Sequence, residues 1–223
     1  MSSHKHPRPP RERAIPIASE GFLPIAVSAF VTVYLGALGF GVMALFFGAV
    51  TVFLAFFFRD PERETPEQAG VVVSPADGKV VEVGIVQGSA FTSDEALKIS
   101  VFMSIFNVHV NRIPAGGKVT EISYHRGKFF SANLDKSSRE NEHNAVTLET
   151  EGGQRLIVVQ VAGLIARRIV CKVHEGDQLR RGERFGMICF GSRLDVYLPS
   201  DTRPAVSVGD KVSAGVSVLG HVT

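Results

Sequence analysis

A glycine followed by a serine interrupts an apolar segment close to the end of the chain. The segment Arg184–Pro199 predicts one β-strand, a break at Gly191 and Ser192, and then a second β-strand. Glycine permits strained backbone conformations, so the hydroxyl of Ser192 could reach the carbonyl of Gly191 and form an ester with it. Elimination from such an ester leaves dehydroalanine, which hydrolyses to a ketone. A Gly-Ser step in a β protein is more often a simple turn, and these two residues alone leave both possibilities open.

Two other polar residues could supply acid–base groups, and each also has an ordinary structural explanation. Asp77 lies in the sequence Pro-Ala-Asp-Gly, which by itself predicts a turn. His109 stands among Phe106, Val108 and Val110, where a structural strand histidine is common. An imidazole nevertheless has an unperturbed pKa of about 6.5, which suits proton transfer near neutral pH.

Several unrelated segments together resemble the short-form phosphatidylserine decarboxylases. They occur in the family's order, and the resemblance extends from about residue 20 to the end of the chain. In the segment Asn141–Asn144, His143 replaces an arginine of the family pattern. The segments that carry the resemblance are Phe57–Arg63 (FFRDPER), Val73–Val80 (VSPADGKV), Phe102–Pro114 (FMSIFNVHVNRIP), Asn141–Asn144 (NEHN) and Arg181–Pro199 (RGERFGMICFGSRLDVYLP).

The resemblance implies a membrane-associated proenzyme that cuts itself between Gly191 and Ser192. Ser192 then becomes a covalent pyruvoyl group, and the cut gives a large chain of residues 1–191 and a small chain of about 32 residues. Serine is a weak nucleophile, so the family assignment makes His109 its base and Asp77 the group that orients the imidazole. The pyruvoyl ketone would form a Schiff base with phosphatidylserine, release CO2 and give phosphatidylethanolamine.

One departure from the longer relatives concerns a second histidine three residues after the first. Arg112 occupies that position here, so either His109 does both jobs or another histidine serves, with His143 as the next candidate. Arg112 and His143 are also candidate substrate-binding residues. Arg167 and Arg168 could bind the lipid phosphate or carboxylate by bidentate hydrogen bonds, although a solvated pair is the alternative.

The N-terminal quarter predicts a membrane-associated helical hairpin after a basic arm of residues 1–14. Residues 22–58 carry no charged side chain. A single helix of that length would measure about 55 Å, far more than the roughly 30 Å hydrocarbon core of a bilayer. Three glycines near the middle favour two helices, at about 22–38 and 41–58. Both are short for a full span, so a shallow or interfacial hairpin remains open.

Charges on either side of this hairpin predict its topology. Four basic residues precede the first helix, and Arg59 and Arg63 follow the second. The positive-inside rule then places both ends, and the domain that follows, on the cytoplasmic side of the cell membrane. The predicted division of the chain is an arm at 1–14, a hairpin and linker at 15–65, and a β-rich catalytic domain at 66–223.

The catalytic domain is predicted to be mainly β. Helix-length periodic segments are scarce after Pro66, and Arg126–Glu140 predicts a long loop. About nine short β-branched segments are separated by Gly, Asp and Pro, which is typical of all-β domains. They are Val71–Val73, Lys79–Val86, Lys98–Phe102, Lys118–Tyr124, Val146–Thr150, Leu156–Val161, Ile169–Val173, Phe185–Phe190 and Leu194–Leu198.

A weak internal repeat refines this fold class. The segment Glu175–Gly182 resembles Val208–Gly215, and Ala76–Val80 resembles Ala115–Val119 more loosely. Each Gly-Asp unit predicts a tight turn followed by a strand. Such units recur in sandwich-like barrels that carry lipoyl or biotinyl groups, so we expect hairpins of that kind.

Composition excludes several classes of function. Hydrophobic residues make up 45% and charged residues 21% of the chain, which is typical of globular proteins. A net charge of +2, no Trp and three Tyr argue against a nucleic-acid partner. Cys171 and Cys189 are too few and too far apart to suggest a metal site, so we expect two buried thiols in a reducing compartment and no metal.

Two other hypotheses use the same features. A non-enzymatic membrane adaptor on a lipoyl-like barrel would suit the hairpin and the repeats, but the chain lacks long coiled-coil segments. A carrier domain would be modified at Lys79 or Lys118, but neither lies in a carrier's Met-Lys sequence. An adaptor would be one intact chain and a carrier would bear an adduct, so intact mass separates both from a self-cut enzyme.

The family resemblance also implies a homodimer.

Overall fold

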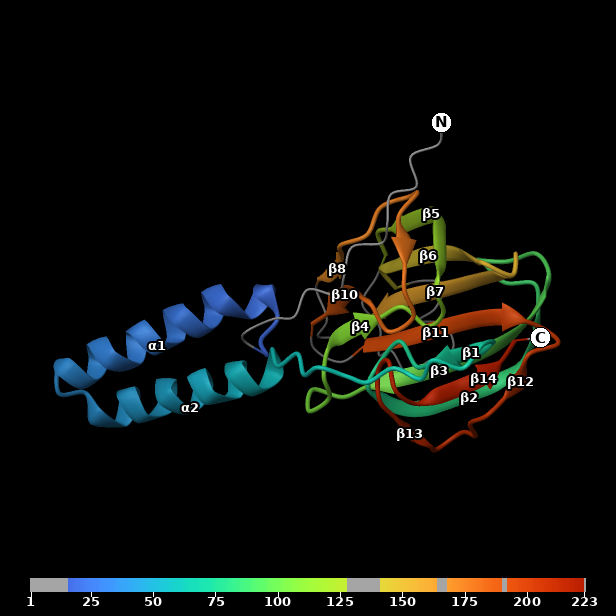
Figure 1. The fold of residues 1–223 in the computed structure, drawn as a ribbon. Helices are drawn as coiled ribbons and strands as arrows, with labels where there is room; N and C mark the ends of the chain where they lie inside the picture. The colour runs from blue at the N-terminus through green and yellow to red at the C-terminus, as the bar shows by residue number, and fades with distance from the viewer. Residues whose placement is uncertain (1–15, 128–140, 164–167, 190–191, 223) are drawn as a thin grey trace. The chain divides into compact units, whose positions relative to one another are not determined.

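The computed structural model describes residues 16–127, 141–163, 168–189 and 192–222 (Figure 1). The described chain forms two compact units, one within residues 12–62 and the other within residues 63–223.

The first unit is a pair of helices. A short 3-10 helix, Ser19–Gly21, leads into α1 (Phe22–Ala37), and α2 (Gly41–Phe57) follows after a turn. Gly39 lies in this turn with a φ of 83°, a conformation that glycine adopts without steric cost. The predicted helices at about 22–38 and 41–58 are confirmed to within one residue at each end.

Small polar side chains join the two helices at one point. The hydroxyl of Ser28 donates to the carbonyl of Phe47 at 3.3 Å, and the hydroxyl of Thr51 donates to Ser28 at 2.9 Å. The helical stretch Ser19–Ala37 is long and apolar enough to cross a membrane, whereas α2 falls in the shorter class. Large apolar side chains remain exposed on both helices, and this apolar surface supports association with a membrane. They include Leu23, Phe30, Val33, Val42, Leu45 and Phe46.

The second unit is built of β-strands joined by short turns. The strands are β1 (Val71–Val73), β2 (Gly78–Gln87), β3 (Glu95–Met103), β4 (Val110–Arg112), β5 (Gly117–His125), β6 (His143–Thr150), β7 (Arg155–Ala162), β8 (Ile169–Cys171), β9 (Gln178–Leu179), β10 (Arg184–Ile188), β11 (Ser192–Pro199), β12 (Arg203–Pro204), β13 (Lys211–Val212) and β14 (Val218–His221).

These strands form one large sheet and two small ones. The large sheet has the order β13-β2-β3-β11-β7-β6-β5-β9, and the small sheets have the orders β1-β14-β12 and β4-β10-β8. All strand pairs are antiparallel. The large sheet is curved, and β11 lies between β3 and β7 in its middle (Figure 1).

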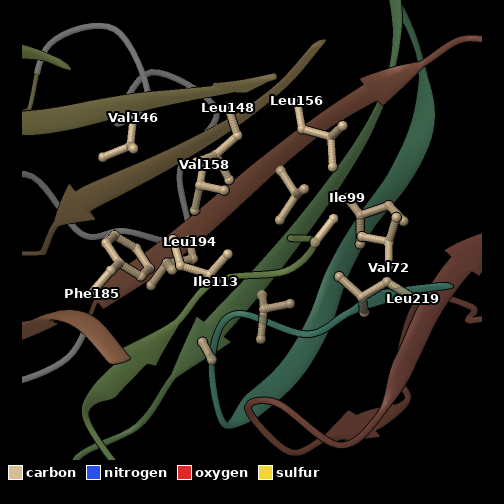
Figure 2. Close-up of a cluster of buried hydrophobic side chains, with 14 of the residues drawn as sticks. Val72, Ile99, Ile113, Val146, Leu148, Leu156, Val158, Phe185, Leu194 and Leu219 are labelled. Carbon is tan, nitrogen blue, oxygen red and sulfur yellow. The ribbon is translucent and has the colours of Figure 1, made fainter. Parts of the chain in front are cut away.

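The main hydrophobic core lies between the large sheet and the two small ones. Strands of the large sheet contribute alternate residues, such as Ile99, Val158 and Leu194, because side chains of a strand point to opposite faces in turn. Val72 and Phe185 contribute from the small sheets, and both are fully buried (Figure 2). The opposite face of the large sheet carries a second, smaller cluster that includes Val159, Val161 and Tyr197.

The mainly β fold class predicted from the sequence is confirmed. Each of the nine predicted strands overlaps an observed one. The pattern missed five short strands, β4, β9, β12, β13 and β14, because two to four residues are too few to show an alternation.

The internal repeat predicted from the Gly-Asp units is present as two matching turns. Asp177 and Asp210 each accept a hydrogen bond at 2.8 Å from the backbone N–H three residues upstream. The carbonyl of Asp177 accepts from Val119 N–H at 2.9 Å, and the carbonyl of Asp210 accepts from Val80 N–H at 2.8 Å. The two copies therefore pair alike, β9 with β5 and β13 with β2. A closer likeness to lipoyl or biotinyl domains stays a prediction.

Candidate active site

Ser192 is the first residue of β11 and lies between two neighbouring strands. Its register partners are Met103 on β3 and Ala162 on β7. The Ser192 side chain is fully buried, and its Oγ has no hydrogen-bond partner within the described residues. A buried hydroxyl without a partner is uncommon and calls for an explanation. Gly191, the other half of the predicted cleavage site, lies outside the described residues.

The Ser192 side chain points to the core-facing side of the large sheet. Leu194 and Val196 follow it at two-residue spacing on β11, and both belong to the main core. Its register partners, Met103 and Ala162, belong to the same core. The hydroxyl therefore faces the space between the large sheet and the small sheet β4-β10-β8.

His109 directly precedes β4, which pairs with the strand that leads to the cleavage site. Its carbonyl accepts a hydrogen bond from Ile188 N–H at 3.4 Å, and Val110 pairs with Met187. Ile188 ends β10, and Ser192 starts β11 four residues later. The His109 side chain is fully buried, including both ring nitrogens.

A buried chain of three amides fixes the position of β4 against the large sheet. The Asn111 Oδ1 accepts from Gln160 Nε2 at 2.9 Å, and the Gln160 Oε1 accepts from Asn144 Nδ2 at 3.0 Å. Gln160 also donates to the Val170 carbonyl at 3.4 Å. Asn144 is 2% exposed and the other two amides are fully buried, so their hydrogen bonds act in a medium of low dielectric constant.

The amide chain links the strand that follows His109 with two strands that pair with Ser192. Asn111 Nδ2 lies 3.7 Å from the sulfur of Met103, the residue that pairs with Ser192. His109 stands two residues before Asn111, directly ahead of β4. The amides thus join β4, the strand that follows His109, to β7 of the large sheet, which pairs with the strand of Ser192.

Asp77 lies in the turn between β1 and β2, and its carboxylate has two other partners. Its Oδ1 and Oδ2 accept from Arg63 Nη2 at 3.2 and 3.0 Å. Its Oδ1 also accepts from the backbone N–H of Ala214 at 2.7 Å. The structure therefore joins Asp77 to Arg63 and Ala214, whereas its predicted hydrogen bond to the His109 imidazole is not among these contacts.

Arg112 points to the opposite side of β4 from Asn111. Its Nη1 donates to the carbonyl of Gly182 at 3.1 Å, and its side chain is nearly buried. A Cβ added at Gly215 would lie 2.9 Å from its Cδ. Arg112 therefore packs against the two repeated turns.

His143 lies on the face of the large sheet opposite to Ser192. It pairs with Val161, which belongs to the second cluster on that face. Burial lowers the pKa of the His143 imidazole below its ordinary value, the backbone carbonyl of Asn141 opposes this shift, and His125 adds to it. The His125 ring stacks on His143 with centroids 5.0 Å apart. The structure does not bring His143 to Ser192.

The remaining predicted residues lie at the edge of the site. Arg168 is exposed, and its carbonyl accepts from Cys189 N–H at 3.4 Å, whereas Arg167 lies outside the described residues. Cys171 and Cys189 are half-buried and form no disulfide, so the expectation of two buried thiols is wrong. No group of three or more His, Cys, Asp or Glu side chains suited to a metal ion occurs in the described part of the chain.

Three residues of the site were not predicted from the sequence. Asn111 and Gln160 gave no signal, because a single amide within an apolar strand has no characteristic spacing. Arg63 stood in the FFRDPER segment, and its distance from Asp77 in sequence concealed the ion pair between them.

Comparisons with known proteins identify relatives of the whole chain. Residues 50–220 match the family model described as phosphatidylserine decarboxylase. A relative from Geotalea uraniireducens is 50% identical over 210 residues, which cover 94% of this chain and 98% of the relative.

Two further relatives agree. One from Geobacter metallireducens is 51% identical over 215 residues, covering 94% of this chain and 98% of the relative. One from Syntrophus aciditrophicus is 55% identical over 170 residues, covering 76% of this chain and 80% of the relative. All three relatives are named phosphatidylserine decarboxylase proenzyme.

Proposed function

Because the chain belongs to the phosphatidylserine decarboxylase family, we propose that it decarboxylates phosphatidylserine with a pyruvoyl group made from its own Ser192. The relatives are named proenzymes, which supports a chain that is cut before it acts. The observation that carries the proposal is the buried hydroxyl of Ser192, which has no partner among the described residues and begins the strand after β10.

Self-cleavage begins when the Ser192 Oγ attacks the carbonyl carbon of Gly191. The peptide C–N bond breaks, the nitrogen takes a proton, and an ester now joins the two residues. A base then removes the Cα proton of residue 192, the ester C–O bond breaks, and Gly191 leaves as a carboxylate. The remaining dehydroalanine takes up water and releases ammonia, which leaves a ketone at the new amino end.

His109 is the proposed base for the hydroxyl proton of Ser192. The buried amide chain supports this role, because it joins β4, the strand after His109, to β7, which pairs with the strand of Ser192. A serine hydroxyl is a weak nucleophile at neutral pH, so a nearby neutral imidazole supplies the activation that it needs.

We propose that His109 also returns the proton after CO2 has left. Arg112, at the position of the family's second histidine, donates to the Gly182 carbonyl, and His143 lies on the opposite face of the sheet. Neither offers a second acid beside Ser192. One histidine would thus serve both reactions in turn.

Asp77 is the proposed acidic partner of this histidine, on the strength of its match to the family's SPADG segment. Its carboxylate is held by Arg63 and by the N–H of Ala214. Among the described residues its Oδ2 accepts only the bond from Arg63, so this oxygen can also accept a hydrogen bond from the His109 ring.

The pyruvoyl carbonyl supplies an electron sink for the amino acid headgroup, as pyridoxal phosphate does in other decarboxylases. The buried position of residue 192 fits such a group, because it keeps the reacting carbonyl away from bulk water. Arg168, exposed beside Cys189, is the proposed contact for the lipid phosphate.

Cleavage would leave a large chain of residues 1–191 and a small chain of residues 192–223. Strand β11 pairs with β3 on one edge and with β7 on the other, and both belong to the large chain. The small chain therefore stays bound without a covalent link.

The apolar helices of the first unit suit an enzyme whose substrate is a membrane lipid. We propose that they anchor the chain in the cell membrane with the catalytic unit on the cytoplasmic side, as the flanking basic residues predict. A homodimer is proposed on family resemblance alone, and its test is the mass of the detergent-solubilised enzyme.

The decisive experiment replaces Ser192 with alanine and measures CO2 release from phosphatidylserine vesicles. Ser192→Ala should remain a single chain and release no CO2, because no pyruvoyl group can form. Ser200→Ala, at an exposed serine just beyond β11, is the matched control and should keep full activity. An active Ser192→Ala variant would contradict the proposal, and an adaptor would show one intact, inactive chain in both variants.

A further inference from the structure

Asp77 takes part in a three-way contact between distant parts of the chain. Arg63 Nη2 donates to both of its oxygens, at 3.2 and 3.0 Å, and Ala214 N–H donates to its Oδ1 at 2.7 Å. The exposed fractions of the Arg63 and Asp77 side chains are only 17% and 13%. Charge-assisted hydrogen bonds of this kind are stronger than neutral ones, and partial burial reduces their screening by salt.

The segment that carries Arg63 is fixed to the catalytic unit at two further points. Thr65 packs on Gly182, where an added Cβ would lie 2.1 Å from the threonine Oγ1. Arg181 Nη1 donates to the carbonyls of Gln68 and Val71 at 2.8 and 2.7 Å. Arg63 is therefore part of an ordered strap, defined here as residues 63–71, and its guanidinium has a fixed place.

The internal repeat shows that this fold forms the same turn without a carboxylate. Gly116 is the counterpart of Asp77, and Arg181 N–H is the counterpart of Ala214 N–H. An added Cβ at Gly116 would lie 3.5 Å from the Arg181 nitrogen, so the backbones approach each other in both copies. Because the second copy forms its turn with glycine, folding of the turn does not account for an acid at residue 77.

We propose that Arg63 is a positioning residue that holds the Asp77 carboxylate in the orientation needed for self-cleavage. This inference rests on the proposed function, in which Asp77 serves the cleavage of the Gly191–Ser192 bond. Without Arg63, a largely buried carboxylate would keep only one hydrogen-bond donor among its described partners, and its orientation would no longer be determined.

The test follows the rate at which freshly synthesised full-length chain separates into two chains, by intact mass. Arg63→Ala should slow self-cleavage by about tenfold or more, and Arg63→Lys should recover part of the rate, because it keeps the charge but loses the fork geometry. Arg181→Ala is the matched control, since it removes an anchor of the same strap that does not touch Asp77. It should lower the melting temperature without slowing cleavage to the same extent.

A double substitution shows whether Arg63 acts through Asp77. Asp77→Asn alone should slow cleavage at least as much as Arg63→Ala, and the double variant should be no slower than Asp77→Asn. Hydroxylamine, which cleaves esters rapidly and amides slowly, adds a second readout. Both single variants should respond to it alike, because both fail at the same step.

The outcomes separate the inference from the proposed function. Cleavage of Arg63→Ala at the wild-type rate, with Asp77→Asn blocked, would overturn the positioning role and leave the proposed function intact. An equal slowing by Arg63→Ala in both backgrounds, or opposite responses to hydroxylamine, would also overturn it. Normal cleavage by Asp77→Asn would instead remove Asp77 from the mechanism, and the role of Arg63 with it.

Discussion

The two copies of the internal repeat share a backbone but not their chemistry. Residues 70–86 with the turn at 207–217 form one copy, and residues 109–125 with the turn at 174–184 form the other. The carbonyl of Gly70 accepts from Val222 N–H at 2.9 Å, and its counterpart is the carbonyl of His109, which accepts from Ile188 N–H at 3.4 Å. A glycine in one copy is thus the proposed base in the other.

Two further pairs of positions differ, in opposite senses. Asp77 in the first copy corresponds to Gly116 in the second, and apolar Val72 in the first corresponds to the buried amide of Asn111 in the second. Paired hairpins can therefore build the fold without these polar groups. Two of the polar residues that interrupt the repeat, Asp77 and His109, are the ones proposed for the reaction.

The largest expected effect comes from removing His109, which the second copy has where the first copy has Gly70. His109→Ala removes the proposed base, so self-cleavage should slow by about 10²- to 10⁴-fold, the usual contribution of general base catalysis. The measurement is the fraction of two-chain protein over time by intact mass. His174→Ala, at an exposed histidine of the same copy, should cleave normally. Normal cleavage of His109→Ala would assign the base elsewhere.

The amide chain that exists only beside His109 should matter next. Gln160→Leu leaves Asn111 and Asn144 without their shared partner, so the free energy of unfolding should fall by about 2–4 kcal/mol. Urea unfolding in a Ser192→Ala background, which keeps one chain, measures this. The exposed Gln178→Leu should change stability by less than about 0.5 kcal/mol.

A double substitution would sharpen this comparison between the two copies. Asn111→Val makes the second copy apolar, as Val72 makes the first, and should recover part of the stability lost in Gln160→Leu. The physical reason is that Gln160→Leu alone leaves the buried Asn111 amide without Gln160 as its partner, whereas the added Asn111→Val removes that amide. Further loss in the double variant would show that the amides do not act as a pair.

The same substitution should destabilise both matching turns. Gly182 and Gly215 have φ of 79° and 73°, so Gly→Ala at either should cost about 1–3 kcal/mol of stability. Gly182→Ala should cost more, because the new Cβ would meet Thr65. Gly84→Ala, with open space and ordinary φ, should cost less than about 1 kcal/mol in thermal unfolding. Unequal responses in the reverse order would contradict the equivalence of the turns.

The smallest expected effect concerns His143, on the face away from Ser192. Its folded-state pKa is lowered, so the unfolded chain binds the proton more readily. Its contribution to stability is therefore present above the unfolded pKa of about 6.5 and is lost as pH falls from there through the lowered folded pKa. His143→Gln should flatten this part of the pH–stability curve, and an unchanged curve would contradict the shift.

The regular parts of this structure were predictable from the sequence, and the parts that depend on long-range contacts were not. The uncharged apolar stretch with its glycines gave both helices, the β-branched segments gave the longer strands, and the Gly-Asp units gave the repeated turns, because each is a local property. A strand as short as β4 depends on its pairing with β10, which lies far away in the sequence. No local pattern could reveal that pairing.

The same division applies to the candidate site. Ser192, His109 and Asp77 were identified by motif, but motifs do not specify which side chains meet. The structure places Arg63, not the imidazole, on the Asp77 carboxylate, and it places His143 on the wrong face of the sheet to substitute for a second histidine beside Ser192. Side-chain partners depend on strand register, which one sequence does not determine.

The central claim is that Ser192 becomes the ketone at the start of a separate small chain, and the mass of that chain tests it most directly. Purified active enzyme should yield a fragment of residues 192–223 that is lighter by one ammonia than the peptide beginning with serine. A single covalent chain of all 223 residues in active enzyme, or a small chain that still begins with serine, would contradict the account.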